Sequence, residues 1–144
     1  MARGPEARLY QRVKENLPRA TITRLESKVG LGIPDCLIAL EKDCWVMLEL
    51  KVVKTGKKVK LSPHQIAFQL KHASLGMPTY ILVHHQKTGT TRPADGRLLL
   101  YHGAQAEEVY RLGIDAKPLD SWRLDAVLWD VLRYRLLCGD DTNI

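Results

Sequence analysis

Residues 35–53 read Asp-Cys-Leu-Ile-Ala-Leu-Glu-Lys-Asp-Cys-Trp-Val-Met-Leu-Glu-Leu-Lys-Val-Val, and this stretch decides the fold. Two apolar runs, 35–40 and 44–53, flank a short polar segment. This pattern predicts two consecutive strands joined by a tight connection. Because side chains alternate across a strand, Glu49 and Lys51 project to one face of the second strand. Asp35 precedes Glu49 by 14 positions, which is the length of such a hairpin. The hairpin can therefore bring Asp35 beside Glu49.

Three charged groups at the edge of an apolar hairpin suggest catalysis rather than packing. Burying charges without partners is costly, and two neighbouring carboxylates repel each other unless a hard cation lies between them. Mg²⁺ suits such a pair because it needs few protein oxygens and keeps several waters. Beside a phosphodiester it polarises the phosphoryl oxygen and lowers the pKa of a bound water, and Lys51 can orient that water or stabilise the developing charge. The pattern therefore favours metal-dependent phosphodiester hydrolysis.

The rest of the chain predicts one domain, residues 1–144, in the α/β class. Gly4-Pro5 opens a helix at about 6–17, and Ser62-Pro63 begins another that Gly76 ends. The order αβββαββαα predicts a mixed sheet flanked by helices. Besides the hairpin, its expected elements are strands at 21–26, 79–85 and 98–102, a short helix at 104–112 and a last helix at 121–137.

The composition fits an intracellular protein with a polyanionic partner. No apolar run reaches the length of a membrane span and no signal peptide is visible, so we expect no membrane contact. Three cysteines without a CxxC pair suggest a reducing compartment, so we expect a cytoplasmic location. The net charge is +6, and all of the excess lies in residues 1–60, which hold 13 Lys/Arg against 7 Asp/Glu. This asymmetry points to nucleic acid, although a solvated basic face remains the alternative.

A run of lysines follows the second strand of the hairpin directly. It adds Lys54, Lys57, Lys58 and Lys60 to Lys51 within ten residues. A lysine run is usually a solvated face, but this one adjoins the candidate catalytic residues, so we expect it to contact the DNA backbone. Little aromatic sequence is interleaved with it, so base stacking is not indicated.

Three motifs in order resemble the PD-(D/E)XK nuclease superfamily. They are Gly32-Ile33-Pro34-Asp35, Glu49-Leu50-Lys51 and Leu61-Ser62-Pro63-His64-Gln65. The likeness is greatest to its small members, the archaeal- and phage-type Holliday junction resolvases and the VRR-Nuc nucleases, and it covers about residues 6–83. It implies a restriction-endonuclease-like fold and catalytic roles for Asp35, Glu49, Lys51 and Gln65.

The resemblance also implies a metal site. It has Mg²⁺, with Mn²⁺ as a substitute, bound by Asp35, Glu49, the backbone carbonyl of Leu50 and a glutamate on the first helix. Glu6 matches that glutamate by position. It precedes the apolar residues Leu9 and Tyr10 at helical spacing, so we expect it to face inward. The alternative is a carboxylate placed in the first turn by the helix dipole.

For two polar residues the sequence leaves two alternative roles open. Gln65 either stands beside the scissile phosphate, as the resemblance implies, or closes the capping box Ser62-Pro63-His64-Gln65 by bonding the cap amide. We expect it to serve only one of these roles at a time. Glu26 is either an ordinary strand carboxylate or a residue that contacts the metal ligands without binding the metal itself.

The leading functional hypothesis is a structure-selective endonuclease, a Holliday junction resolvase acting on four-way DNA junctions. Two symmetric cuts require a two-fold assembly, so we expect a homodimer. The expected helix 121–137 has apolar residues on two sides, with Trp122 and Trp129 on one, so this helix is the candidate interface. Its second apolar side could instead be covered within one chain. The rival functions are a sequence-specific homing or restriction-like endonuclease and a catalytically silent DNA-binding module.

Overall fold

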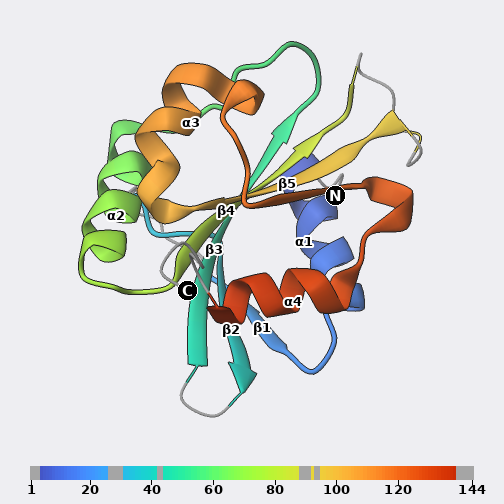
Figure 1. The fold of residues 1–144 in the computed structure, drawn as a ribbon, viewed down its shortest axis with the longest axis horizontal. Helices are drawn as coiled ribbons and strands as arrows, with labels where there is room; N and C mark the ends of the chain where they lie inside the picture. Colours follow the sequence, from blue (N-terminus) through green and yellow to red (C-terminus); the bar gives the residue numbers. More distant parts are fainter. Residues whose placement is uncertain (1–3, 26–30, 42–43, 88–91, 93–94, 139–144) are drawn as a thin grey trace.

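A computed structural model describes residues 4–25, 31–41, 44–87, 92 and 95–138. The described chain forms an open six-stranded mixed sheet with helices on both faces (Figure 1). The expectation of an α/β protein with a helix-flanked mixed sheet is therefore confirmed. The strands are β1 (Thr21–Arg24), β2 (Cys36–Glu41), β3 (Cys44–Val53), β4 (Thr79–His85), β5 (Arg97–His102) and β6 (Asp120–Arg123).

The strands lie in the sheet in the order of the sequence, and only the β3–β4 pair is parallel. Parallel neighbours need a crossover connection, and residues 54–78 supply one that contains helix α2 (Pro63–Ser74). β3 is also the longest described strand: β2 pairs with its first half, up to Leu48, and β4 pairs with it from Met47 to Val53. The candidate catalytic residues thus lie on an interior strand of the sheet.

An apolar core lies on each face of the sheet, between the sheet and the helices that cover that face. Helices α1 (Pro5–Asn16) and α4 (Trp129–Cys138) cover one face, where Leu9, Leu48 and Leu132 are buried. Helices α2 and α3 (Ala106–Leu112) cover the other face, where Ile81 and Val109 are buried. Short 3-10 segments within the described residues, η2 (Gly103–Gln105), η3 (Gly113–Asp115) and η4 (Leu124–Ala126), connect these elements.

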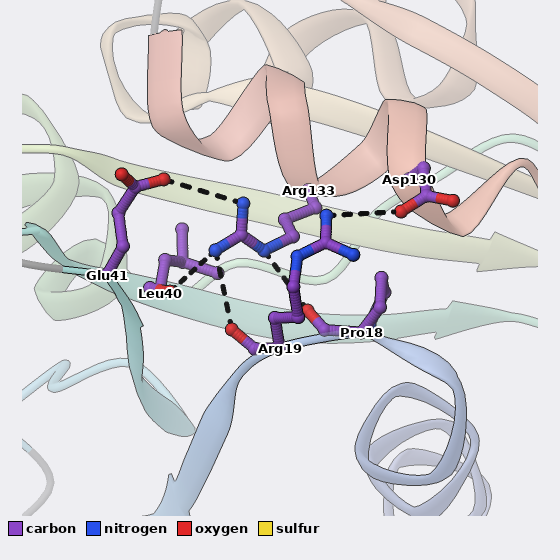
Figure 2. Close-up of polar contacts among 6 residues, drawn as sticks. All are labelled: Pro18, Arg19, Leu40, Glu41, Asp130 and Arg133. Atoms are coloured by element: carbon purple, nitrogen blue, oxygen red, sulfur yellow. Dashed lines mark hydrogen bonds and ion pairs between the residues drawn. The ribbon is translucent and has the colours of Figure 1, made fainter.

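A buried arginine joins helix α4 to the first strands (Figure 2). The Arg133 guanidinium donates to the carbonyls of Pro18 at 3.1 Å, Arg19 at 3.4 Å and Leu40 at 2.6 Å. Its remaining nitrogen lies 3.5 Å from the Glu41 carboxylate, which is mostly exposed. Hydrogen bonds to a charged donor are stronger than neutral ones, so this residue fixes α4 against the loop before β1 and the end of β2.

The expected helix 121–137 is wrong in its first half. Residues 120–123 form β6, which pairs with β5, and α4 begins only at Trp129. Trp122 and Trp129 were expected on one face of a single helix, but they lie in different elements, β6 and α4. Trp122 is buried from the strand, and Trp129 packs against the core of its own chain. The predicted order αβββαββαα consequently lacks one strand, and the long two-sided helix expected as the dimer interface does not form.

No described helix combines the length and apolar character that a membrane span requires.

Candidate catalytic and metal-binding site

The site forms where β2 and β3 separate. The β2–β3 ladder runs to the pair Cys36–Leu48 and β3 continues past it, so its edge beyond Leu48 has no strand beside it on that side. Asp35 occupies this position: its Oδ2 accepts a hydrogen bond from the Leu50 amide at 2.8 Å. The sequence predicted that Asp35 lies beside the Glu49 segment, and the structure places it there.

The backbone of Leu50 faces the same edge as Asp35. The odd-numbered residues of β3 direct their backbone amides and carbonyls toward β4. The Met47 amide donates to the Pro78 carbonyl, and the Val53 carbonyl accepts from the Gln86 amide. Amide and carbonyl of one strand residue point to the same side. Because the Leu50 amide donates to Asp35, the Leu50 carbonyl is also directed toward the open edge. This orientation suits the ligand role expected for it.

Glu49 is a buried carboxylate with only 2% of its surface exposed. Burial, the charge of Asp35 and a side-chain hydrogen bond with Asp35 raise the pKa of Glu49 to about 9, and the nearby ammonium of Lys51 acts in the opposite direction. The Lys51 Nζ lies 3.8 Å from Glu49 Oε2. At neutral pH Glu49 therefore keeps its proton, in a place where a divalent cation could replace it.

Gln65 serves the helix cap and the site together. Its Oε1 accepts from the Ser62 amide at 2.9 Å, and the Gln65 amide donates to Ser62 Oγ at 3.1 Å, which completes the capping box of α2. Its Nε2 donates to Glu49 Oε2 at 3.4 Å. The two ends of the amide therefore reach different partners in one structure, which the expectation of a single role did not foresee, and the catalytic role of Gln65 stays a prediction.

A close backbone contact holds the loop before Asp35 against α2. Gly32 has φ +76°, and a Cβ placed on it would lie 2.2 Å from the carbonyl oxygen of His64. Only glycine permits both the conformation and this approach. The contact fixes the segment that leads to Asp35 against the first turn of α2, which carries Gln65.

Glu6 does not join the two carboxylates directly. Its side chain is exposed, so the expected inward orientation is wrong. Its charge acts on Glu49 as the weakest of the influences that raise the Glu49 pKa. Glu6 lines a cavity of about 350 Å³ together with Lys54, Lys58 and Lys60. Among the residues that the structure describes, no three His, Cys, Asp or Glu side chains form a metal-binding group.

The donors that do converge still fit a magnesium ion. They are the carboxylates of Asp35 and Glu49 and the Leu50 carbonyl, all oxygen atoms at one open edge of β3. Mg²⁺ is commonly bound through one or two carboxylates and completes its octahedron with water and substrate oxygens. The raised pKa of Glu49 is the second observation that fits, because this buried carboxylate needs a positive partner in order to be ionised at neutral pH.

The four loop lysines do not share one environment. Lys58 and Lys60 line a hollow of about 430 Å³ that is also lined by Lys51 and Gln65, so they adjoin two of the candidate catalytic residues. Lys54 lines the cavity beside Glu6. Lys57 instead forms a 3.0 Å ion pair with Asp115. The first three remain candidates for phosphate contact, whereas Lys57 is engaged with its own chain.

Tyr110 is a candidate site residue that the sequence did not indicate. It lies on α3, is half exposed, and lines the hollow of Lys51, Lys58 and Gln65. The Ile114 amide donates to the Lys57 carbonyl at 2.9 Å, so the lysine loop is held against the segment after α3. An aromatic ring therefore does lie beside the lysines, although it is 50 residues away in sequence. Glu26, the other residue with an open role, lies outside the described residues.

Comparisons with protein-family models, with curated protein sequences and with solved structures gave no significant match. The site is therefore interpreted from the geometry of this chain and from the motifs themselves.

Proposed function

We propose that this chain is a Mg²⁺-dependent DNA endonuclease of the PD-(D/E)XK type that cuts branched DNA, a four-way junction first of all. One observation carries the proposal: Asp35, the buried Glu49, Lys51 and Gln65 converge at the open edge of β3. A structural role does not account for this group, because a buried carboxylate with a strongly raised pKa destabilises the fold at neutral pH. Buried, coupled ionisable groups of this kind concentrate at functional sites.

Each side chain has a role that its position supports. Bound Mg²⁺ would supply Lewis-acid polarisation of the phosphate and a water of lowered pKa. Asp35 and Glu49 hold the metal together with the Leu50 carbonyl. Lys51, next to Glu49 and bordering the hollow, donates to the attacked phosphate or orients the water. The Gln65 Nε2 donates to the Glu49 carboxylate and positions it, while the Gln65 Oε1 keeps its contact with the Ser62 amide.

The partner is proposed from charge and placement. Lys58 and Lys60 extend the hollow beside Lys51, and they belong to the N-terminal 60 residues that hold all of the excess positive charge. Cations next to a site that hydrolyses phosphodiesters favour a DNA backbone. Symmetric cutting of a junction requires two active sites, so the proposal includes a homodimer. The interface is left open, since it no longer rests on an amphipathic helix.

The decisive experiment compares matched substrates in Mg²⁺: linear duplex, single strand, flap and four-way junction. We expect paired nicks in the junction, no cutting in EDTA, and binding without cutting in Ca²⁺. Asp35→Asn and Glu49→Gln should abolish cutting while DNA binding is kept, and Glu107→Gln, an exposed glutamate on α3, is the control. Cleavage at a tenth or more of the wild-type rate in either site variant would overturn the assignment. Intact binding with no cutting by the wild-type protein would favour the silent DNA-binding module.

A further inference from the structure

A second cationic hollow lies on the opposite face of the sheet from Glu49. It has a volume of about 190 Å³ and is lined by Arg8 and Arg12 of α1, His84 of β4, and Gln86 just after β4. Leu124 and Pro5 are among its apolar walls. The catalytic side chains do not reach it, because residues 49 and 51 face α2 whereas the α1 face of the sheet carries the even-numbered positions of β3.

The polar groups of this hollow are arranged to receive a negative charge. Arg8 and Arg12 are one helical turn apart, so their guanidinium groups lie on the same side of α1. The Gln86 side chain is only 5% exposed. The described residues that line the hollow include no Asp or Glu. Burial first, and the charges of Arg12, His85 and Arg8 after it, lower the pKa of His84 to about 4. The lining thus brings two guanidinium groups beside a neutral imidazole, and Glu15 lies with the same arginines in the adjoining hollow of α1.

Packing holds the imidazole of His84 at this hollow. His84 follows Leu82 at the alternation of β4, which directs both to the α1 face. A Cβ at Gly96 would lie 3.1 Å from His84 Nε2, so the absence of a side chain at Gly96 leaves room for the ring. A half-buried neutral imidazole can donate or accept one hydrogen bond without the cost of burying another charge.

The hollow also continues the surface of the catalytic site. Pro5 lines both this hollow and the cavity that contains Glu6, Lys54, Lys58 and Lys60. Figure 1 shows the first turn of α1 and the loop after β3 at the same end of the sheet. Positive groups therefore extend from Lys51 and Lys58, past the start of α1, to Arg8 and Arg12 on the other face.

We propose that Arg8, Arg12, His84 and Gln86 form a phosphoryl-binding pocket that holds a backbone phosphate of the DNA cut at Asp35 and Glu49. Two guanidinium groups can bind phosphate oxygens in paired hydrogen bonds, and the Gln86 amide can add a neutral donor. The apolar walls exclude water from one side of the anion and strengthen these bonds. The pocket anchors the DNA beyond the cutting site and thus extends the footprint around the N-terminus of α1. This inference rests on the proposed function for the identity of the anion.

The test uses the full chain in Ca²⁺, so that DNA is bound but not cut. Binding of a four-way junction and of a duplex is measured over a range of salt concentrations for wild type, Arg12→Gln and Arg8→Gln. Lys71→Gln is the control, because it removes one positive charge from an exposed position on α2. We expect each arginine variant to reduce the slope of log K against log salt by about 0.9, and the control to leave it unchanged.

A second readout reports the pocket itself. The His84 Hε1 signal, assigned with His84→Gln, is followed by NMR during addition of DNA and, separately, of inorganic phosphate. A bound anion should shift this signal in the wild type and not in Arg12→Gln. A silent His84 with an unchanged salt slope in both arginine variants overturns the pocket, even if the protein cuts DNA. A response to inorganic phosphate without one to DNA also overturns it. A response to DNA in a protein that cuts no substrate keeps the pocket and refutes only the nuclease.

Discussion

Replacing Glu49 with glutamine should remove a pH dependence of stability that the buried carboxylate imposes. Burial and the charge of Asp35 raise the pKa of Glu49 from 4.5 to about 9. Between these values the folded protein holds a proton that the unfolded chain has released. Stability is therefore full below about pH 4.5 and is lost as the pH rises toward 9. The free energy of unfolding of the wild type should fall through this window.

The slope is set by the number of protons, which is at most one for Glu49. One proton corresponds to about 1.4 kcal/mol per pH unit, so the loss between pH 7.0 and 8.5 should be about 2 kcal/mol. This interval avoids two other groups. Burial lowers the pKa of His84 from 6.5 to about 4, which reduces stability only as the pH falls below 6.5. Burial raises the pKa of Cys36 from 9.0 to about 12, which acts only at higher pH.

The measurement is urea denaturation in EDTA at three pH values for wild type, Glu49→Gln and the exposed control Glu107→Gln. The wild type and the control should lose about 2 kcal/mol across the interval, whereas Glu49→Gln should lose little of it. A Glu49→Gln slope as steep as that of the wild type would refute the reasoning. Titration with Mg²⁺ at pH 7, in buffers of different ionisation enthalpy, should release close to one proton per metal bound. Metal binding without proton release would contradict the placement of the ion at this carboxylate.

Four further changes test individual contacts. Lys51→Ala should lose turnover while calorimetry shows Mg²⁺ still bound; lost metal affinity would contradict its role. Gln65→Ala should lower both turnover and stability, the latter by about 0.5–2 kcal/mol; a melting temperature equal to that of the wild type would argue against the cap. Lys58→Ala should reduce the slope of log K for DNA binding against log salt by about 0.9. Lys57→Ala should leave the slope unchanged, because Lys57 pairs with Asp115; a smaller slope for Lys57→Ala alone would contradict both assignments. Arg133→Met should lower the free energy of unfolding by on the order of 3 kcal/mol in urea, because buried carbonyls lose a charged donor; a loss below 1 kcal/mol would make the cluster of Figure 2 incidental.

The hairpin could be predicted because its signals are local. β3 spans Cys44–Val53 as expected, and alternation alone places Glu49 and Lys51 on one face. The capping box at Ser62 is equally local and is present. Residues 120–126 show the opposite case. We expected residues 121–126 to belong to the last helix, but residues 120–123 pair with β5 and residues 124–126 form η4, and so short a strand cannot be recognised without its partner.

The dual role of Gln65 could not be found from the sequence for a different reason. The capping box and the motif position each account for the residue, and nothing local shows that one amide has room for both. The structure decides by direction: the oxygen turns back to Ser62, and the nitrogen reaches Glu49 across the gap between α2 and β3. A side chain with a donor and an acceptor can bridge two elements where a carboxylate could not.

Tyr110 shows how the missing part of a site arises from long-range packing. The lysine loop has no aromatic residue, and its sequence therefore argues against base stacking. Gly113 lies so close to the Lys57 carbonyl that a Cβ there would meet it at 2.0 Å. This backbone contact brings the end of α3 to the loop and Tyr110 to the hollow of Lys58 and Gln65. A ring held next to cations and a phosphate-cleaving edge can stack on an exposed base, which a fully paired duplex does not offer. The same backbone contact holds the lysine loop and brings an aromatic ring to it, and under the proposed function this ring would favour unpaired or branched DNA.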